Sequence, residues 1–385
     1  MAPSMSQFLP LPELRRLARE HATDERYRAR LRSRMVFSAL VEPLRWYEKL
    51  RYGAELRRTR IAEAPLFLLG FGRSGTTHLH NLFWRDGRFG LVTNYQANVQ
   101  PIALTGRGWL DRYLAGRMPA RRPMDNVAVA LDGPQEEEIA LLNATADAPL
   151  HFMSYPRALP GIYERWVSEL GRDARDVATW KTHYVEVLKK ATILSGGKRL
   201  VLKTPPNTAR IPVLLELFPD ARFVHIVRDP YPVYQSMRNM YRKVLPRQTL
   251  QDFAWEDIDA WVLDAYRLLM TRYLADRKQI PSGRLVEVRY EDLDARPLEV
   301  LPQIYEALGL PDFEAVRPRI EAYLTGLGRF EKNRFEYPAD VVAAVDEHWG
   351  FAFEAFGYAR ASARERGVEA TAEAASAARE GGLGR

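Results

Sequence analysis

The chain has 385 residues, 46% of them hydrophobic and 27% charged, which is the composition of an ordinary globular protein and excludes a disordered or fibrous one. It contains no cysteine, so disulfides, zinc–thiolate sites, iron–sulfur clusters and a cysteine nucleophile are excluded. The formal net charge of +7 favours an anionic ligand without requiring a nucleic acid, and no nucleic-acid partner is expected.

Residues 1–60 are expected to form an N-terminal helical segment. Leucines recur at helical spacing among arginines near residue 15, and basic and aromatic residues interleave from Leu40 to Leu56. Two interpretations stay open: amphipathic helices that pack on the main domain, which is favoured, or a platform for peripheral contact with a membrane or a lipid substrate. The longest uncharged apolar stretch, residues 64–72, is far shorter than the ~20 residues of a membrane span, and no signal peptide is recognised. A cytoplasmic location is therefore expected.

The next part of the chain alternates short apolar segments with longer helical patterns. Strands are predicted at residues 65–70, 199–203, 222–227 and 284–289. Helices are predicted at residues 76–84, at 134–143 with Pro134 in the first turn, at 207–218 with Asn207 as the cap, from 232, and at 253–277 and 297–308. Residues 88–133 favour irregular structure with short helices. This alternation predicts one α/β domain over residues 61–360, a P-loop-type three-layer fold with a mostly parallel sheet, followed by a low-complexity tail at 361–385.

The first predicted strand runs into a glycine-rich loop, Gly-Phe-Gly-Arg-Ser-Gly-Thr-Thr, at residues 70–77. Gly70, Gly75 and Thr77 match the phosphate-loop pattern GxxxxGK[ST], but Thr76 stands where the lysine belongs. The loop amides at the start of the following helix predict a phosphate site made by Arg73, Ser74, Gly75, Thr76 and Thr77. Because that lysine normally reaches the β and γ phosphates, its absence indicates a ligand without such a pair. Arg73 supplies a nearby cation instead.

A second anion site is predicted where the third strand ends. Arg228 leaves the carboxyl end of that strand in Val-Arg-Asp-Pro, and Ser236 lies eight residues later in the next helix. Ligands of open α/β sheets bind at the carboxyl ends of strands. An arginine with a hydroxyl nearby at that edge favours an anion clamp.

Together these two motifs, Phe-Leu-Leu-Gly-Phe-Gly-Arg-Ser-Gly-Thr-Thr-His-Leu at 67–79 and Phe-Val-His-Ile-Val-Arg-Asp-Pro at 223–230, resemble the sulfotransferase superfamily that uses 3′-phosphoadenosine 5′-phosphosulfate (PAPS). The bacterial branch near the tyrosylprotein and carbohydrate sulfotransferases is the most similar. The resemblance implies that the first loop holds the 5′-phosphosulfate and that Arg228 and Ser236 hold the 3′-phosphate. It also implies adenosine 3′,5′-bisphosphate as the product and no metal ion. The late Arg-Lys-Gly loop of the cytosolic enzymes is not found, and residues 328–333 are the candidate replacement.

Sulfuryl transfer needs a cation at the leaving group and a base at the acceptor. Lys203, at the end of the second strand, is the predicted cation, with Arg73 as the second one. For the base, Glu137 is placed first and Glu136 second in Pro-Gln-Glu-Glu-Glu. On a helix start the two side chains point about 100° apart, so at most one of them is expected to face the site. The open alternatives are a solvated acidic helix start, or a base drawn from His78 and His80.

The predicted function is transfer of a sulfuryl group from PAPS to a hydroxyl or amine of a small-molecule, carbohydrate or lipid acceptor. A nucleotide kinase or triphosphatase is the first alternative, although Thr76 argues against it. A non-catalytic anion- or membrane-binding protein is the second. Aromatic residues of the segments expected to shape the acceptor pocket are Trp109, Tyr113, Phe152, Tyr155, Tyr163 and Trp166, which are equally consistent with core positions.

Overall fold

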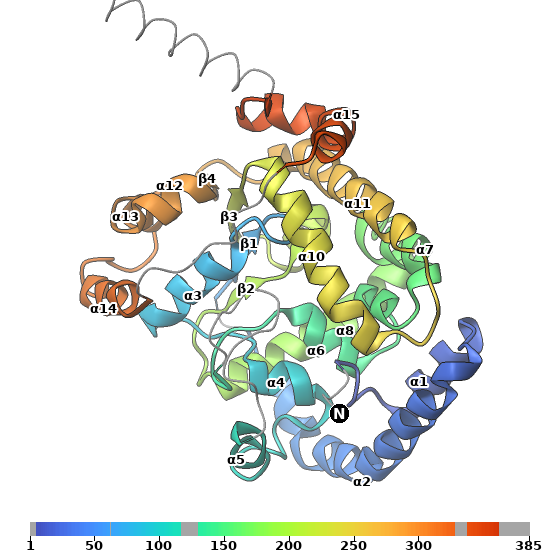
Figure 1. Cartoon of the computed structure of the whole chain (residues 1–385). Coiled ribbons are helices and arrows are strands. Elements are labelled where there is room, and N and C mark those ends of the chain that lie inside the picture. The colour runs from blue at the N-terminus through green and yellow to red at the C-terminus, as the bar shows by residue number, and fades with distance from the viewer. Residues whose placement is uncertain (1–4, 62, 117–129, 328–336, 362–385) are drawn as a thin grey trace, which may run out of the picture.

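The computed structural model describes residues 5–61, 63–116, 130–327 and 337–361. Its centre is a parallel sheet with the strand order β2-β1-β3-β4 (Figure 1). The strands are β1 (Leu66–Leu69), β2 (Val201–Lys203), β3 (Arg222–Val227) and β4 (Leu285–Arg289). All four strands predicted from the apolar segments are confirmed. In the register, Leu68 pairs with Lys203 and Leu69 with His225, so the carboxyl ends of β1, β2 and β3 meet at one edge.

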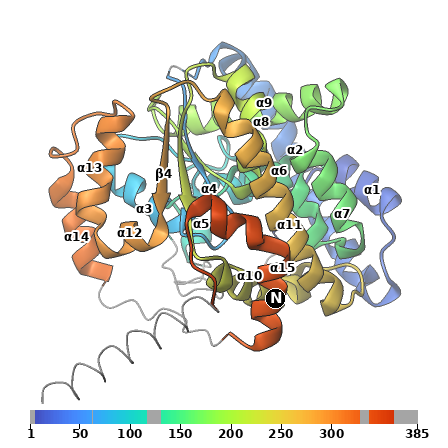
Figure 2. The same cartoon turned by 90° about the horizontal axis from the view of Figure 1, so that it is seen from above.

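Helices cover both faces of this sheet because successive side chains of a strand point to opposite faces and both sets are apolar. Leu66 and Leu68 pack with α3 (Thr76–Asp86) on one face, and Phe67 and Leu69 pack with α8 (Ala174–Leu194) on the other. The first face also carries α12 (Tyr290–Ala295), α13 (Pro297–Ala307) and α14 (Arg317–Leu327). The second also carries α6 (Glu137–Ala144), α9 (Ile211–Leu217) and part of α11 (Trp255–Asp276) (Figure 2). The predicted α/β class and three-layer arrangement are therefore confirmed.

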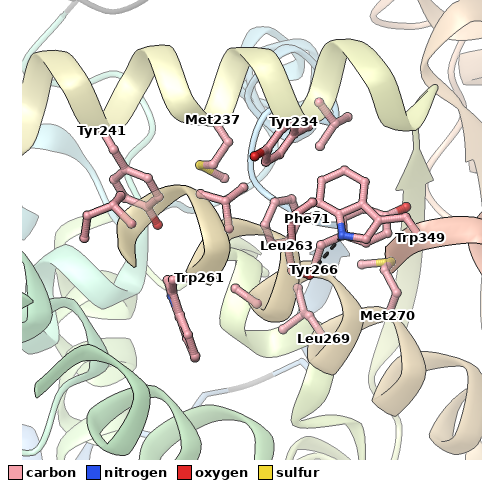
Figure 3. Packing of buried hydrophobic residues seen from close by; sticks show 14 of the residues in the cluster. Phe71, Tyr234, Met237, Tyr241, Trp261, Leu263, Tyr266, Leu269, Met270 and Trp349 are labelled. Carbon is pink, nitrogen blue, oxygen red and sulfur yellow. Dashed lines mark hydrogen bonds between the residues drawn. The ribbon is translucent and has the colours of Figure 1, made fainter. Parts of the chain in front are cut away.

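A third hydrophobic cluster anchors the loop that follows β1. It joins α10 (Pro230–Gln248), α11 and α15 (Ala339–Phe356), and Figure 3 shows Phe71 of the loop inserted among their aromatic side chains. The Phe71 ring meets Tyr266 edge-on at 5.0 Å between centroids. Tyr266 stacks on Trp349 at 3.9 Å, and the Trp349 indole donates a 2.9 Å hydrogen bond to the Leu263 carbonyl. The buried Phe71 thus fixes the position of the glycine-rich loop.

The N-terminal segment consists of α1 (Leu11–Glu20), a 3₁₀ turn at Glu25–Tyr27, and α2 (Arg28–Arg58). The prediction of a second helical stretch that starts at Leu40 is too short, because α2 runs unbroken for 31 residues from Arg28. From Arg34 to Glu48, every third or fourth side chain of α2 is buried, so tertiary packing stabilises the helix on the N-terminal side of Leu40 as well.

Two helix starts differ from the prediction. Helix α6 begins at Glu137 rather than Pro134, and Glu136 precedes it with an extended backbone. Asn207 does not cap α9, because it lies inside a 3₁₀ turn at Pro205–Ala209 and its side chain donates to Glu137 instead.

The remaining helices are α4 (Asn94–Val99), α5 (Leu110–Ala115) and α7 (Leu159–Tyr163). Short 3₁₀ turns lie at Gln100–Ile102, Pro149–Met153, Pro156–Ala158 and Arg277–Gln279, and a π turn lies at Glu164–Ser168. Of the helices in the described ranges, none has the length and apolar character that a membrane crossing requires.

Candidate functional site

The glycine-rich loop between β1 and α3 depends on glycine at two positions. Gly70 has φ +142°, and a Cβ there would lie 2.5 Å from the Ile226 carbonyl oxygen. Gly75 has φ +95°, and a Cβ there would lie 2.2 Å from the ring of Tyr290. Both positions therefore require a residue without a side chain. The Gly70 amide donates a 2.8 Å hydrogen bond to the Thr208 hydroxyl, which ties the loop to the 3₁₀ turn that follows β2.

The loop ends at the N-terminus of α3, where unpaired amides and the helix dipole favour an anion. Helix α3 begins at Thr76, and the side chains of Ser74 and Thr76 are buried against the loop. Arg73 adopts a left-handed conformation, with φ +70°, inside the turn. Residues 70–77 thus form the predicted turn between a strand and a helix N-terminus, and their binding of a phosphate stays a prediction.

The structure brings the two predicted anion motifs together. The Arg73 Nε donates a 2.9 Å hydrogen bond to the Ser236 hydroxyl, although 163 residues separate them. Arg228 donates from Nη1 to the Arg73 carbonyl oxygen at 3.2 Å, and its guanidinium carbon lies 4.3 Å from the centroid of the Tyr290 ring. Arg228 and Ser236 therefore both border the loop directly through Arg73. Sequence reasoning missed the stacking role of Tyr290, although this residue follows a predicted strand in Arg-Tyr-Glu-Asp.

A lysine–glutamate pair occupies the same edge of the sheet. The Lys203 Nζ donates a 2.5 Å hydrogen bond to the Glu136 carboxylate. The Lys203 side chain is only 3% exposed, whereas that of Glu136 is 25% exposed. The pair thus presents a cation held in place by burial and a carboxylate that solvent or a substrate can reach.

Glu137 is buried under this pair in a hydrogen-bond network. Its carboxylate accepts from the Lys203 backbone amide at 3.0 Å, from the Tyr184 hydroxyl at 3.1 Å and from the Asn207 amide group at 3.2 Å. Burial raises the pKa of Glu137 to about 7, although the hydrogen bond from Tyr184 and the charge of Lys203 act against this rise. The prediction that both glutamates lie on a helix start is wrong for Glu136, which precedes the helix in an extended conformation. Both carboxylates contact Lys203, but only Glu136 is partly exposed, whereas Glu137 is fully buried.

Glu138, the third acidic residue of the segment, has a separate partner. Its carboxylate forms a wholly buried ion pair with Arg210, which also donates from Nε to the Trp166 carbonyl at 3.1 Å. The Arg210 guanidinium lies over the Trp180 ring. Neither this pair nor the contacts of Tyr184 and Asn207 were predicted. The one usable signal was that Asn207 follows the end of a strand at the ligand edge.

The two histidines considered as bases differ in their surroundings. His80 is buried beside Lys203, and burial together with the lysine charge lowers its pKa to about 3. A neutral imidazole that solvent cannot reach is poorly placed to accept a proton from an acceptor. His78 is half-buried.

Other predicted features fall outside this edge of the sheet or outside the described residues. Phe152, Tyr155, Tyr163 and Trp166 are buried in the hydrophobic clusters, whereas Trp109 and Tyr113 are exposed on and beside α5. The candidate late loop at 328–333 lies outside the described residues. Within the described ranges, no group of three or more histidine, aspartate or glutamate side chains could hold a metal ion.

Residues 65–315 match the model of the sulfotransferase family, and this stretch contains the loop, Arg228, Ser236 and the Lys203–Glu136 pair. The chain belongs to the sulfotransferase family. One similar protein is the omega-hydroxy-beta-dihydromenaquinone-9 sulfotransferase Stf3 of Mycobacterium tuberculosis. It is 32% identical over 314 residues, which cover 82% of this chain and 80% of the relative.

Solved structures of mycobacterial sulfotransferases have the same fold. STF9 from Mycobacterium avium matches with a TM-score of 0.61 at 21% identity over 81% of each chain. STF1 from Mycobacterium tuberculosis matches with a TM-score of 0.58 at 18% identity over 88% of this chain and 90% of that one. The P-loop-type fold inferred from the strand–loop–helix pattern is therefore confirmed.

Proposed function

We propose that this sulfotransferase takes its sulfuryl group from PAPS. The observation that carries the proposal is that the phosphate loop lies against the Arg228–Ser236 clamp while Thr76 replaces the phosphate-loop lysine. Two separate anion sites at one edge of the sheet match a ligand with a 5′-phosphosulfate and a 3′-phosphate. The missing lysine matches the absence of a β–γ phosphate pair.

In this proposal the donor is held by residues of two motifs. The amides of residues 74–77 and the side chain of Arg73 hold the 5′-phosphosulfate. Arg228 and Ser236 hold the 3′-phosphate. The contact of Arg228 with the Tyr290 ring fixes the orientation of the guanidinium toward that phosphate. The Arg73–Ser236 hydrogen bond joins the two sites, so occupation of one positions the other.

The transfer itself is assigned to Lys203 and an adjacent glutamate. As the acceptor oxygen forms its bond to sulfur, its proton passes to a carboxylate, and the bond from sulfur to the bridging oxygen of the phosphate breaks. Lys203 stabilises the charge that grows on that oxygen. We place Glu136 before Glu137 as the base, because Glu136 is partly exposed and Glu137 has both oxygens occupied within the protein. Glu137 then positions Lys203 through its backbone.

The acceptor proposed here is a hydroxyl group on a lipid. Support comes from the name of the Stf3 relative, which describes a hydroxylated menaquinone derivative, and from the extent of that match. We further propose that residues 61–360 form the catalytic domain, with 1–60 as an N-terminal helical segment and 361–385 as a tail, in a cytoplasmic protein.

A melting experiment tests the donor assignment. Adenosine 3′,5′-bisphosphate should raise the melting temperature of the protein, and MgATP should not. A stabilisation at saturating ligand of about 2.7 kcal/mol is expected when the ligand is present at 100 times its Kd. Stabilisation by MgATP alone would contradict the proposal and favour a nucleotide kinase or triphosphatase.

A further inference from the structure

Helix α2 carries an exposed apolar stripe that no other described element covers. Its members are Val36, Leu40, Trp46, Tyr47 and Leu50. At 100° per residue they fall within an arc of about 120°, which places them along one side of the helix. Leu40 is 73% exposed and Leu50 is 82% exposed. Five of the nine large hydrophobic side chains that are exposed in the described residues thus lie on this one helix.

Helix α5 extends this stripe on one flank. Leu110 and Leu114 of α5 share a hydrophobic cluster with Val41 and Leu44 of α2, so the two helices are neighbours (Figure 1). Trp109 and Tyr113 are exposed on this neighbour. Tryptophan and tyrosine are the residues enriched where a protein meets the boundary between lipid headgroups and acyl chains.

A basic cleft opens on the other flank of α2, between α2 and α8. It encloses about 740 Å³, and six cations line it. Arg45, Lys181 and Lys190 are each paired with a glutamate. Lys49, Arg57 and Lys189 form no ion pair with any residue that the structure describes. A second cleft of about 680 Å³ shares Arg57 and Lys189 and adds Arg58 and Arg60.

Charge and apolar surface are therefore combined on one helix. Helix α2 contains nine basic and three acidic residues, a net charge of +6, in a chain whose formal net charge is +7. A two-fold contact between copies of the chain through this stripe would bring like charges together, which is unfavourable. An anionic lipid surface satisfies both features, because the stripe enters the apolar boundary while the cations meet phosphate groups.

We infer that α2 and α5 form a membrane-docking face, with the stripe inserted at the lipid interface and the basic cleft holding an anionic lipid headgroup. Helix α2 lies along the edge of the molecule in Figure 1, with its long axis free to lie in the plane of a membrane. This inference concerns lipid binding and does not depend on the sulfuryl-transfer chemistry.

Vesicle flotation with the full chain tests the charged part of the face. The probes are vesicles of phosphatidylcholine alone and of phosphatidylcholine mixed with phosphatidylglycerol. Binding should require phosphatidylglycerol and weaken as salt rises. The double variant Lys49→Gln/Lys189→Gln should lower the partition coefficient about 30-fold, at ~1 kcal/mol for each cation. The matched control Lys198→Gln/Lys278→Gln removes the same charge elsewhere and should change binding less than about twofold if the effect is local.

A second pair of variants tests the apolar part. Leu50→Ser should lower vesicle binding about tenfold, since one leucine leaves the apolar phase. The control Leu327→Ser, at an exposed leucine of α14, should bind as the wild type does. The melting temperature of each variant shows whether it is folded. Binding of adenosine 3′,5′-bisphosphate by each variant shows whether the proposed donor site is intact, so failure of this inference can be told from failure of the proposed function. Three outcomes would overturn the inference. The wild-type protein does not bind vesicles; the variants and their controls lose binding equally; or Leu50→Ser loses a dimer without a change in vesicle binding.

Discussion

The substitution Glu136→Gln separates the two adjacent glutamates most sharply. The exposed quarter of the Glu136 side chain, and its 2.5 Å contact with the Lys203 amine, place a carboxylate at the ligand edge of the sheet. Glutamine keeps the shape and an oxygen that can accept from Lys203, but it cannot take up a proton. The change therefore removes the base and leaves the packing.

The expected loss follows from this role. A positioned general base contributes about 10²–10⁴-fold to a rate, so kcat should fall by that factor, or about 3–5 kcal/mol in activation free energy. Glu137→Gln is the matched control at the next residue. Its carboxylate is fully buried and bonded to Tyr184, Asn207 and the Lys203 backbone, so its loss should alter stability more than Glu136→Gln does and kcat less.

The assay measures release of adenosine 3′,5′-bisphosphate at saturating PAPS with a series of hydroxyl acceptors. The loss in Glu136→Gln should shrink for acceptors of lower pKa, because these acceptors need less help to lose a proton. A Glu136→Gln enzyme with wild-type kcat would rule out Glu136 as the general base. So would a folded Glu137→Gln enzyme that loses more kcat than Glu136→Gln.

Three further predictions concern neighbouring residues. Arg228→Ala should weaken PAPS binding by about 10–100-fold with a smaller change in kcat, because it removes a charge-assisted contact worth ~1.5–3 kcal/mol, and an unchanged KM for PAPS would remove the 3′-phosphate assignment. Lys203→Ala should lower kcat about 10²–10³-fold while calorimetry shows nearly unchanged binding of adenosine 3′,5′-bisphosphate, since the charge it stabilises grows only in the transition state. Burial raises the pKa of Glu137 from 4.5 to about 7, so the folded protein holds a proton over this range that the unfolded chain has lost. The free energy of unfolding should therefore fall as pH rises from 4.5 to 7, and urea titrations of Glu137→Gln should lack this component.

The strands and the residues at their carboxyl ends could be predicted from the sequence alone. Each apolar segment formed a strand, and parallel strands end at one edge, so Arg73, Lys203, Arg228 and Ser236 could be expected near one another. The loop could also be predicted, because the glycine pattern from Gly70 onward is the one that fits a phosphate site between a strand and a helix.

Features that depend on packing between distant segments could not be predicted. The positions of Glu136 and Glu137 depend on where α6 begins, and α6 begins three residues later than predicted. Asn207 was expected to cap a helix, but its side chain bonds Glu137 and Tyr184, whose position depends on how α8 lies on the sheet. The extent of α2 was also missed, because its first turns contain mostly arginine and are held by tertiary contacts such as that of Arg34 with the Gln248 carbonyl.

Mass spectrometry of the purified protein incubated with PAPS and a hydroxyl-bearing isoprenoid quinone tests the proposed sulfuryl transfer itself. We expect the acceptor to gain the mass of one SO₃ group while an equal amount of adenosine 3′,5′-bisphosphate appears, and Lys203→Ala to slow both together. Release of adenosine 3′,5′-bisphosphate without a sulfated acceptor would contradict the lipid hydroxyl as acceptor. No consumption of PAPS with any hydroxyl or amine acceptor would contradict PAPS as the donor.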